Sequence, residues 1–315
     1  MKNNFKTLTA IGMCLLLLAA CTKTKDNNTT TSDPKQHNQD VNNVKSESDN
    51  SNSDINTAVN GNSTFGKNGS VESLAICGGS VDTTPNTAHS VTITYDGSEC
   101  YGRRRTGQII ITLVSGTHWS DQGAVLKITY KEYKVIFINN NNHYVTFNGT
   151  KYLTDVNGIT WATLITGGSL GQIKERGDSL SLTFEDNTSR VWGVARKTTY
   201  LVTTPLPSLV ISSTVDGDSI TPDNRTLDTW GTTRFGTHFS VQVNQAWQSN
   251  SACGWWKPIA GMYTCVADNF TLSATFGVNS SGVAINATDC TAYGYKLDWT
   301  INANNSTGEA ILPYW

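Results

Sequence analysis

The sequence has no apolar run long enough to cross a bilayer as a helix. The longest run, Ala10–Ala20, has 11 residues, whereas a spanning helix takes about 20. Two lysines precede it, so it has the composition of a secretory signal that is removed. It ends in Leu-Ala-Ala followed by Cys21, the pattern of a bacterial lipobox. We therefore expect residues 1–20 to be a lipoprotein signal peptide and Cys21 to be lipidated.

Lipid on Cys21 would attach the protein to a membrane, because several acyl chains anchor stably where one is marginal. The alternative is an ordinary secretory signal followed by a cysteine by coincidence. Thr22 follows the cysteine, in place of the aspartate that resembles an inner-membrane retention mark in Gram-negative lipoproteins. The pattern favours the outer membrane and leaves open whether the protein faces the periplasm or the cell surface.

Neither sign of charge dominates the chain. Its 23 basic and 25 acidic residues leave a formal net charge of −2. No basic stripe is present, so nucleic acid is not an expected partner. The one basic cluster, Arg103–Arg105, is typical of a solvated hairpin turn, with contact to an anion or a lipid headgroup as the alternative.

Large apolar residues are scarce between Thr22 and Gly69, where Asn, Asp, Ser and Thr predominate. Such a segment buries too little surface to offset the loss of chain entropy. We therefore predict that residues 21–70 are the lipidated cysteine and a disordered polar tether. A coil of about 45 residues would reach about 35 to 40 Å.

From about Val71 apolar residues recur at every second position, the pattern of half-buried strands. Helical spacing does not persist beyond one turn after the signal. The fold class predicted for residues 71–315 is therefore all-β, an antiparallel meander forming a sandwich or a barrel-like body. The clearest runs are Val91, Ile93 and Tyr95; Ile109, Ile111 and Leu113; Leu180, Leu182 and Phe184; and Phe239, Val241 and Val243.

Turn-forming pairs separate these runs and predict hairpin corners or loops. Pro205 and Pro207 cannot donate to a central ladder, so residues 203–208 should end a strand and form either a sub-domain boundary or a loop. The turn pairs are Asp96-Gly97, Asn148-Gly149, Asn157-Gly158, Asp216-Gly217 and Ser281-Gly282.

Cysteine spacing lacks the Cys-x-x-Cys pattern of a zinc site, and no paired histidines accompany it. With Cys14 removed and Cys21 lipidated, an odd number remains in a compartment where disulfides persist. Spacing alone does not fix the pairing. We favour Cys77 with Cys100 and Cys253 with Cys290, which leaves Cys265 either buried or reactive.

Catalytic patterns are weak. The segment Gly167–Gly171 has the Gly-x-Ser-x-Gly form of a nucleophile elbow, but that motif needs a following helix and these flanks predict strand and turn. Ser169 is therefore interpreted as a loop serine. The histidines are scattered in sequence, and nothing argues that they form a triad. We expect no cofactor and no enzymatic activity.

Two short patterns suggest weaker sites. Asp216, Asp218 and Asp223 offer oxygen ligands for a structural calcium ion, although the spacing is not that of an EF-hand and a plain Asx-rich turn is the favoured interpretation. Short Asp-Ser/Thr-apolar patterns place candidate O-glycosylation at Thr83, Ser179 and Ser219.

The nine tryptophans could stack on sugar rings if they lined one open face, or could simply pack the core. Trp192 should be half-buried in a strand. Trp255 and Trp256 are adjacent, so in a strand they would point to opposite faces. Trp255 or Trp256, with Tyr263, is the candidate ligand-contact surface.

Three blocks of this sequence resemble, in the same order, a group of uncharacterised bacterial lipoproteins. The resemblance covers about Val91 to Trp299 and implies an outer-membrane lipoprotein with a β-rich body and no catalytic residue to transfer. It matches Cys253 and Cys290 to a late cysteine pair and Cys100 to an early one; Cys77 and Cys265 look like additions. The blocks are VTITYDGSECYGRRRTGQIIITLVSG, FEDNTSRVWGVARKTTYLV and WGTTRFGTHFSVQVNQAWQSNSACGWW.

Three functional hypotheses follow. The first is an outer-membrane-anchored, non-enzymatic protein with a structural, adhesive or accessory binding role. The second is a carbohydrate- or glycan-binding surface module, which would need several tryptophans along one exposed groove. The third is a hydrolase, which would need His118 or His143 to meet a carboxylate and a nucleophile in a pocket.

Overall fold

The structure is a computed structural model that describes residues 33–60, 62, 65, 75–82, 89–158, 170–203, 208–218, 221–253, 257–287 and 289–314. Its elements are α1 (Pro34–Asn60), β1 (Gly79–Asp82), β2 (Ser90–Cys100), β3 (Arg103–Ser115), β4 (Val125–Phe137), β5 (His143–Asp155), β6 (Gly171–Phe184), β7 (Ser189–Thr203), β8 (Ser208–Val215), η3 (Pro222–Asn224), β9 (Thr229–Thr232), β10 (His238–Asn250), η4 (Ser251–Cys253), β11 (Pro258–Ala267), β12 (Phe270–Val278), β13 (Gly294–Ile301) and β14 (Ser306–Pro313).

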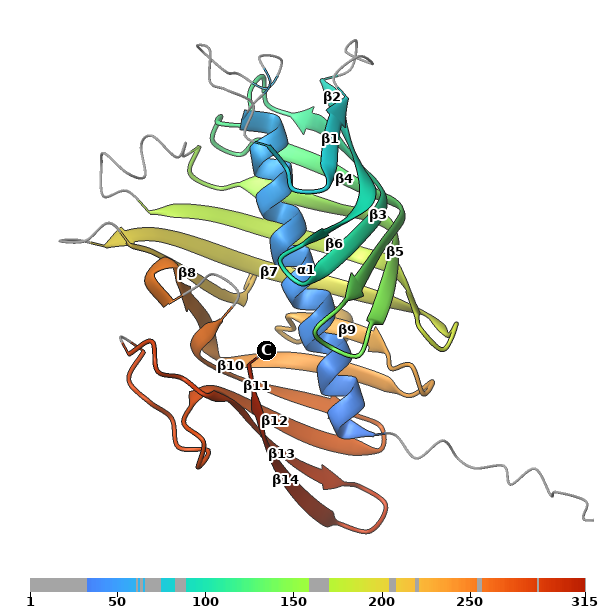
Figure 1. Cartoon of the computed structure of the whole chain (residues 1–315), viewed down its shortest axis with the longest axis vertical. Coiled ribbons are helices and arrows are strands. Elements are labelled where there is room, and N and C mark those ends of the chain that lie inside the picture. The colour runs from blue at the N-terminus through green and yellow to red at the C-terminus, as the bar shows by residue number, and fades with distance from the viewer. Residues whose placement is uncertain are drawn as a thin grey trace, which may run out of the picture. The chain divides into compact units, whose positions relative to one another are not determined.

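The strands form one antiparallel meander sheet, in which almost every strand pairs with its neighbour in sequence (Figure 1). This confirms the predicted all-β antiparallel fold. The period-two alternation arises because every second side chain is buried. Val91, Ile93, Ile109 and Ile111 all have 0% of their surface exposed. These side chains point to the same face of the sheet and form its core with the matching residues of the neighbouring strands.

The meander is interrupted between β7 and β10. Two short strands bridge them: β8 pairs with the C-terminal halves of both, and β9 pairs with Trp192–Val194 of β7 and with His238–Val241 of β10. Asp216 and Asp228 belong to the segment between β8 and β9. The backbone N–H of Ala195 on β7 donates to the Asp228 carbonyl at 2.9 Å, and the Asp216 N–H donates to the Ala195 carbonyl at 3.1 Å. The interruption thus places two acidic residues beside β7 in the middle of the sheet.

The Pro-rich segment 203–208 connects β7 to β8, and Thr203 pairs with Ser208. β7 ends at Thr203 as the sequence predicts. Residues on both sides belong to the same sheet and to one compact unit, Ser32–Trp315. This segment is therefore a connection between neighbouring strands.

Two of the predicted turn pairs are not at hairpin corners. Gly97 and Gly149 lie inside β2 and β5, next to shifts in strand register. Their φ angles are +86° and +110°, which glycine adopts freely. At these two positions the pairs predicted positive φ correctly, but the glycine lies at a strand irregularity and not at a hairpin corner.

The helix α1 corrects the prediction for the tether. The sequence predicts coil over 21–70 and no helix, whereas Pro34–Asn60 forms a 27-residue helix. The Asp33 carboxylate accepts hydrogen bonds from the backbone N–H groups of Lys35 and Gln36, at 2.9 and 3.3 Å. An Asp N-cap followed by proline at the first helical position is a helix-start signal, and it was present in the sequence.

No helix in the described ranges is both long and apolar enough to span a membrane. The longest, α1, lies along one face of the sheet and crosses several strands (Figure 1). Most of its residues are buried although few are apolar: His37, Glu47 and Ser51 each have 0% of their surface exposed. Hydrophobic periodicity therefore could not reveal this helix, because polar side chains make most of its contacts with the sheet.

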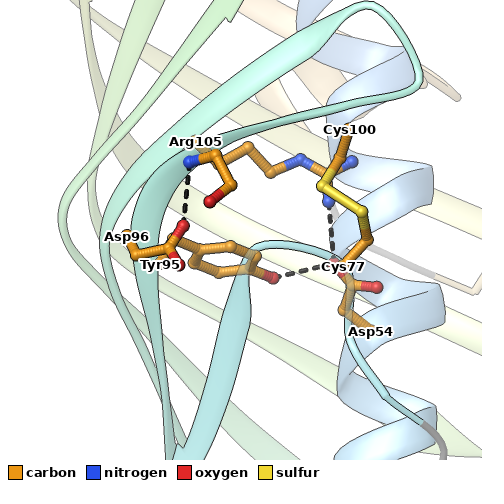
Figure 2. Close-up of a disulfide and its surroundings, with 7 residues drawn as sticks. Asp54, Cys77, Tyr95, Asp96, Cys100 and Arg105 are labelled. Carbon is orange, nitrogen blue, oxygen red and sulfur yellow. Dashed lines mark hydrogen bonds and ion pairs between the residues drawn. A yellow bond between two sulfur atoms is a disulfide. The ribbon is translucent and has the colours of Figure 1, made fainter.

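Both predicted disulfides are present. Cys77 bonds Cys100 and Cys253 bonds Cys290. The Cys77–Cys100 disulfide joins the segment before β1 to the end of β2. It lies close to Tyr95 of β2 and to Asp54 of α1 (Figure 2). It therefore fixes the corner between β2 and β3 relative to the start of the sheet.

Cys265 is free and has 0% of its surface exposed. Burial raises the pKa of its thiol well above the usual range, and a buried neutral thiol is a poor nucleophile. We expect iodoacetamide to leave Cys265 unmodified in the native protein and to alkylate it after unfolding without reduction, measured by peptide mass spectrometry. Alkylation of the native protein at a rate typical of an exposed thiol would contradict this packing.

Candidate functional site

A cavity of about 330 Å³ lies between two distant parts of the sheet, with α1 contributing to its lining. One wall comes from the β2–β3 and β4–β5 corners and the other from β10–β14. The lining combines aromatic rings with amide, hydroxyl and guanidinium groups. Its residues are Asn42, Ser46, Tyr101, Gly102, Arg103, Phe137, Asn139, Asn140, Trp247, Pro258, Phe276, Tyr295 and Tyr314.

The first wall is built on a tight hairpin. Cys100 pairs with Arg103, so Tyr101 and Gly102 form the two-residue corner, with φ angles of +52° and +73°. Positive φ at both positions is the signature of a type I′ turn, which matches the twist of the flanking strands. The turn and the adjacent disulfide constrain the backbone at Tyr101, whose side chain is 93% exposed at the rim.

Arg103 connects this wall to the helix. Its guanidinium lies 3.2 Å from the Glu47 carboxylate and donates to the Ser46 hydroxyl at 3.3 Å. It also lies 5.4 Å from the ring centroid of Phe137, a cation–π distance. The orientation of Arg103 is thus fixed by contacts from both the helix and the sheet.

The second wall is a row of aromatic rings from β10, β12, β13 and the residue that follows β14. Trp247 stacks on Phe276 with centroids 4.1 Å apart, and Phe276 and Tyr295 are 5.5 Å apart. Tyr314 continues the row at 6.1 Å from Tyr295, and its hydroxyl donates to the Pro258 carbonyl at 2.6 Å. Neighbouring rings at these distances pack as a rigid surface.

Amide groups occupy the polar part of the cavity. Asn42 is on α1, and Asn139 and Asn140 are at the β4–β5 corner. The Oδ1 atom of Asn140 accepts a hydrogen bond from Gln39 at 2.6 Å. Its Nδ2 atom is buried without a hydrogen-bond partner in the described structure, which leaves a donor in the cavity lining unsatisfied.

The contact between α1 and the sheet contains several buried polar clusters, one of them centred on Glu47. The Glu47 carboxylate accepts a hydrogen bond from the Tyr133 hydroxyl and lies 3.2 Å from Nε of Arg105. Arg105 also donates to Asp54 at 2.9 Å, and Tyr95 donates to the same carboxylate at 2.8 Å (Figure 2). Burial, reinforced by the Glu47 carboxylate, raises the pKa of Tyr133 well above its usual range.

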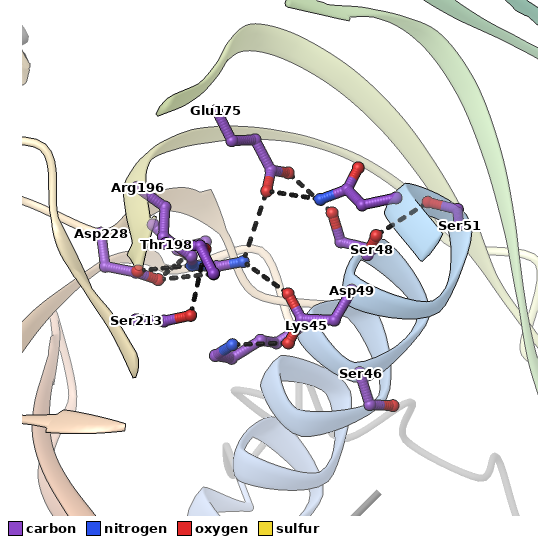
Figure 3. Close-up of polar contacts among 12 residues, drawn as sticks. Lys45, Ser46, Ser48, Asp49, Ser51, Glu175, Arg196, Thr198, Ser213 and Asp228 are labelled. Atoms are coloured by element: carbon purple, nitrogen blue, oxygen red, sulfur yellow. Dashed lines mark hydrogen bonds and ion pairs between the residues drawn. The ribbon is translucent and has the colours of Figure 1, made fainter. Parts of the chain in front are cut away.

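Another cluster, which we call the α1 ion-pair network, consists of Ser48, Lys151, Glu175, Arg196 and Asp228. Figure 3 shows Ser48, Glu175, Arg196 and Asp228 of this network. Lys151 donates to Ser48 at 2.8 Å and to Glu175 at 3.1 Å. Arg196 makes a bidentate pair with Asp228 at 2.7 and 2.8 Å. Burial alone would raise the pKa of Glu175, but the Lys151 and Arg196 cations lower it to about 2. The network therefore stays charged and links α1 to the centre of the sheet.

The basic cluster Arg103–Arg105 is not the solvated turn predicted from sequence. Arg103 and Arg105 reach α1 through ion pairs with Glu47. Arg104 alone is exposed, paired with Glu99 at 3.5 Å. Strand alternation explains the difference, because positions 103 and 105 share the face that α1 covers.

The candidate aromatic contact surface is corrected at Tyr263. This residue is 2% exposed and donates a hydrogen bond to Asn38 of α1, so it belongs to the helix contact. Trp255 and Trp256 lie outside the described residues. Trp192, expected to be half-buried, is 2% exposed and packs against His37.

The candidate calcium ligands converge on a lysine. Lys174 lies 3.1 Å from Asp216 and 2.6 Å from Asp218, so its ammonium supplies the positive charge that the sequence assigned to calcium. The side chain of Asp223 lies outside the described residues. Among the residues that are described, no group of three or more His, Cys, Asp or Glu side chains is arranged to hold a metal ion.

The remaining sequence candidates are dispersed. Ser179 is exposed within β6, whereas Thr83, Ser219 and the serine of the Gly-x-Ser-x-Gly segment, Ser169, lie outside the described residues. His143 is 2.7 Å from Glu185, which also accepts a hydrogen bond from Arg234. His118 is 3.7 Å from Asp121 on an exposed loop. These two histidines do not line the aromatic cavity.

Sequence reasoning missed the cavity itself. Tyr101, Trp247 and Tyr314 come from segments far apart in the chain, and no local pattern joins them. One local signal was available at Tyr101-Gly102. These two residues separate two segments of alternating hydrophobicity, and a glycine in such a two-residue connection favours a hairpin corner.

Comparison of the chain with protein families, with curated proteins and with solved structures finds no match.

Proposed function

We propose that this protein is a lipid-anchored, non-enzymatic binding protein of the outer membrane, and that the aromatic cavity is its ligand site. The observation that carries the proposal is the cavity's construction from rigid parts. Its aromatic walls come from two regions of the sheet, and Asn42 and Ser46 of α1 add polar groups to its lining. A largely apolar cavity with a few fixed polar groups is the usual form of a small-ligand site.

The chemistry of the lining supports binding. The described lining residues carry aromatic, amide, hydroxyl and guanidinium groups, and no carboxylate or imidazole is among them. The one cationic group, on Arg103, is held by Glu47 and Ser46. Such groups hold and orient a ligand through ring contacts and hydrogen bonds.

The anchor part of the proposal rests on the lipobox pattern that ends at Cys21. We expect the native precursor, expressed in a Gram-negative host, to incorporate labelled fatty acid and to fractionate with the outer membrane. A Cys21→Ala variant should do neither. Protease treatment of intact cells would then distinguish the cell surface from the periplasm. An unlabelled, soluble native protein would contradict the anchor.

The binding part is tested by thermal unfolding of the mature protein with a library of small metabolites. A ligand at about 100 times its Kd stabilises a protein by about 2.7 kcal/mol, which raises Tm measurably. We expect at least one class of compound to raise Tm in the native protein and less in a Tyr101→Ala variant. A library without such a compound would contradict the proposed binding function.

A further inference from the structure

We infer that the aromatic cavity binds a neutral carbohydrate of one or two sugar rings. The inference rests on the proposed binding function and specifies its ligand. Three observations carry it: the size of the cavity, the combination of ring faces with amides, and the compensation of the one cationic side chain among its described lining residues.

The size sets an upper limit on the ligand. A volume of about 330 Å³ lies at the lower end of the range of about 300 to 1,000 Å³ typical of small-ligand sites. One or two pyranose rings fit this range, and a longer chain would have to extend past the rim. Tyr101 is at that rim and is 93% exposed.

The two walls suit the two kinds of surface that a sugar presents. A pyranose ring has an apolar face of C–H groups, which packs on aromatic rings, and a perimeter of hydroxyl groups. Tyr101 offers an exposed ring on one wall, and the half-buried rings of Trp247 and Tyr314 contribute to the other. Tyrosine combines large contact area with a polar edge, so it can contact both parts of a sugar.

The amides match the hydroxyl groups. A sugar hydroxyl both donates and accepts hydrogen bonds, and so does an amide side chain. Asn42, Asn139 and Asn140 all line the cavity, and the side chain of Asn139 is exposed. An entirely apolar ligand would leave such groups without hydrogen bonds, at a cost in affinity.

The charge favours a neutral ligand over an anion. Arg103 is the only cationic side chain among the described lining residues. Glu47, which is 0% exposed, lies 3.2 Å from it and offsets its charge. The guanidinium therefore keeps hydrogen-bond donors for a hydroxyl group while the Arg103–Glu47 pair has no net charge to attract an anion.

The test is a glycan array probed with the full mature protein, followed by calorimetric titration with the neutral mono- and disaccharides that score. We expect Tyr101→Ala and Asn139→Ala each to weaken binding about tenfold, from loss of a ring contact and of an amide contact. Both residues are exposed, so neither variant should unfold the protein. Tyr152→Ala is the matched control, because Tyr152 on β5 is exposed and does not line the cavity.

Four outcomes overturn the inference. A neutral sugar that binds native protein and both cavity variants equally would bind elsewhere. Binding of only acidic glycans would contradict the charge argument. If no sugar binds but another class of compound raises Tm in a Tyr101-dependent manner, the carbohydrate inference fails and the proposed binding function stands. If no compound of any class binds, both fail.

Discussion

Replacing Arg196 with methionine is expected to lower the free energy of unfolding by about 3 to 5 kcal/mol, the cost of removing one partner from a buried ion pair. Arg196 is 2% exposed and makes a bidentate pair with Asp228, which is 5% exposed. It also lies 3.8 Å from Glu175. Methionine keeps much of the volume but leaves the Asp228 carboxylate buried without its guanidinium.

The measurement is urea unfolding of native and variant protein, followed by tryptophan fluorescence. Arg104→Met is the control, because Arg104 and Glu99 form a pair in which both side chains are 55% exposed. Exposed pairs contribute about 0 to 1 kcal/mol. An Arg196 variant no less stable than the Arg104 variant would show that the network does not form.

The same network predicts how stability depends on pH. The pKa of Glu175 falls from an ordinary 4.5 to about 2 in the folded protein, because the attraction of Lys151 and Arg196 exceeds the effect of burial. The stabilisation from this carboxylate is therefore present above the unfolded pKa and is lost as pH falls from about 4.5 through about 2. In a Glu175→Gln variant this contribution to the acid dependence should disappear.

The second large effect is expected at Ser53, an exposed residue in the C-terminal half of α1. A proline inside a helix removes a backbone hydrogen bond and clashes with the preceding turn, which costs about 3 kcal/mol or more. Here the cost should rise further, because Ile55 and Val59, which follow in the helix, are 0% and 1% exposed in the core. We expect Ser53→Pro to lower the free energy of unfolding of the whole protein by about 3 kcal/mol or more.

Ser53→Ala is the matched control. Alanine is a better helix former than serine, so this variant should be more stable than the native protein by a few tenths of a kcal/mol, roughly the difference in helix propensity. Both variants change the same exposed side chain, so only the backbone effect differs between them. Comparison of their urea midpoints is the measurement. If residues 34–60 were a coil in solution, as composition suggested, the two variants would unfold at the same urea concentration.

Much of the fold could be predicted from local sequence. Period two identified the strands through Ile109 and Ile111 and through Leu180 and Leu182, because each alternate side chain is buried on the same face. The two cysteine pairs favoured from the sequence are the two disulfides that the structure contains. The free cysteine, Cys265, is buried, one of the two states expected for it.

The candidate site could not be predicted in the same way. Its walls meet only when the β2–β3 corner faces strands β10–β14, and polar side chains hold the helix that contributes to it. Asn38 accepts a hydrogen bond from Tyr263, 225 residues away, and Gln39 donates to Asn140, 101 residues away. Local sequence patterns carry no information about pairs at such separations.

The sequence by itself determined the strand pattern, because alternation depends only on neighbouring residues. The cysteine pairs that it favoured are those in the structure, and lipid attachment at Cys21 stays a prediction from the lipobox pattern. Tertiary structure decided that Pro34–Asn60 is a helix and that an aromatic cavity lies beside it. The physical reason is that Glu47, Ser48 and Asp54 are polar, and only partners on the sheet, such as Arg105 and Lys151, make their burial favourable.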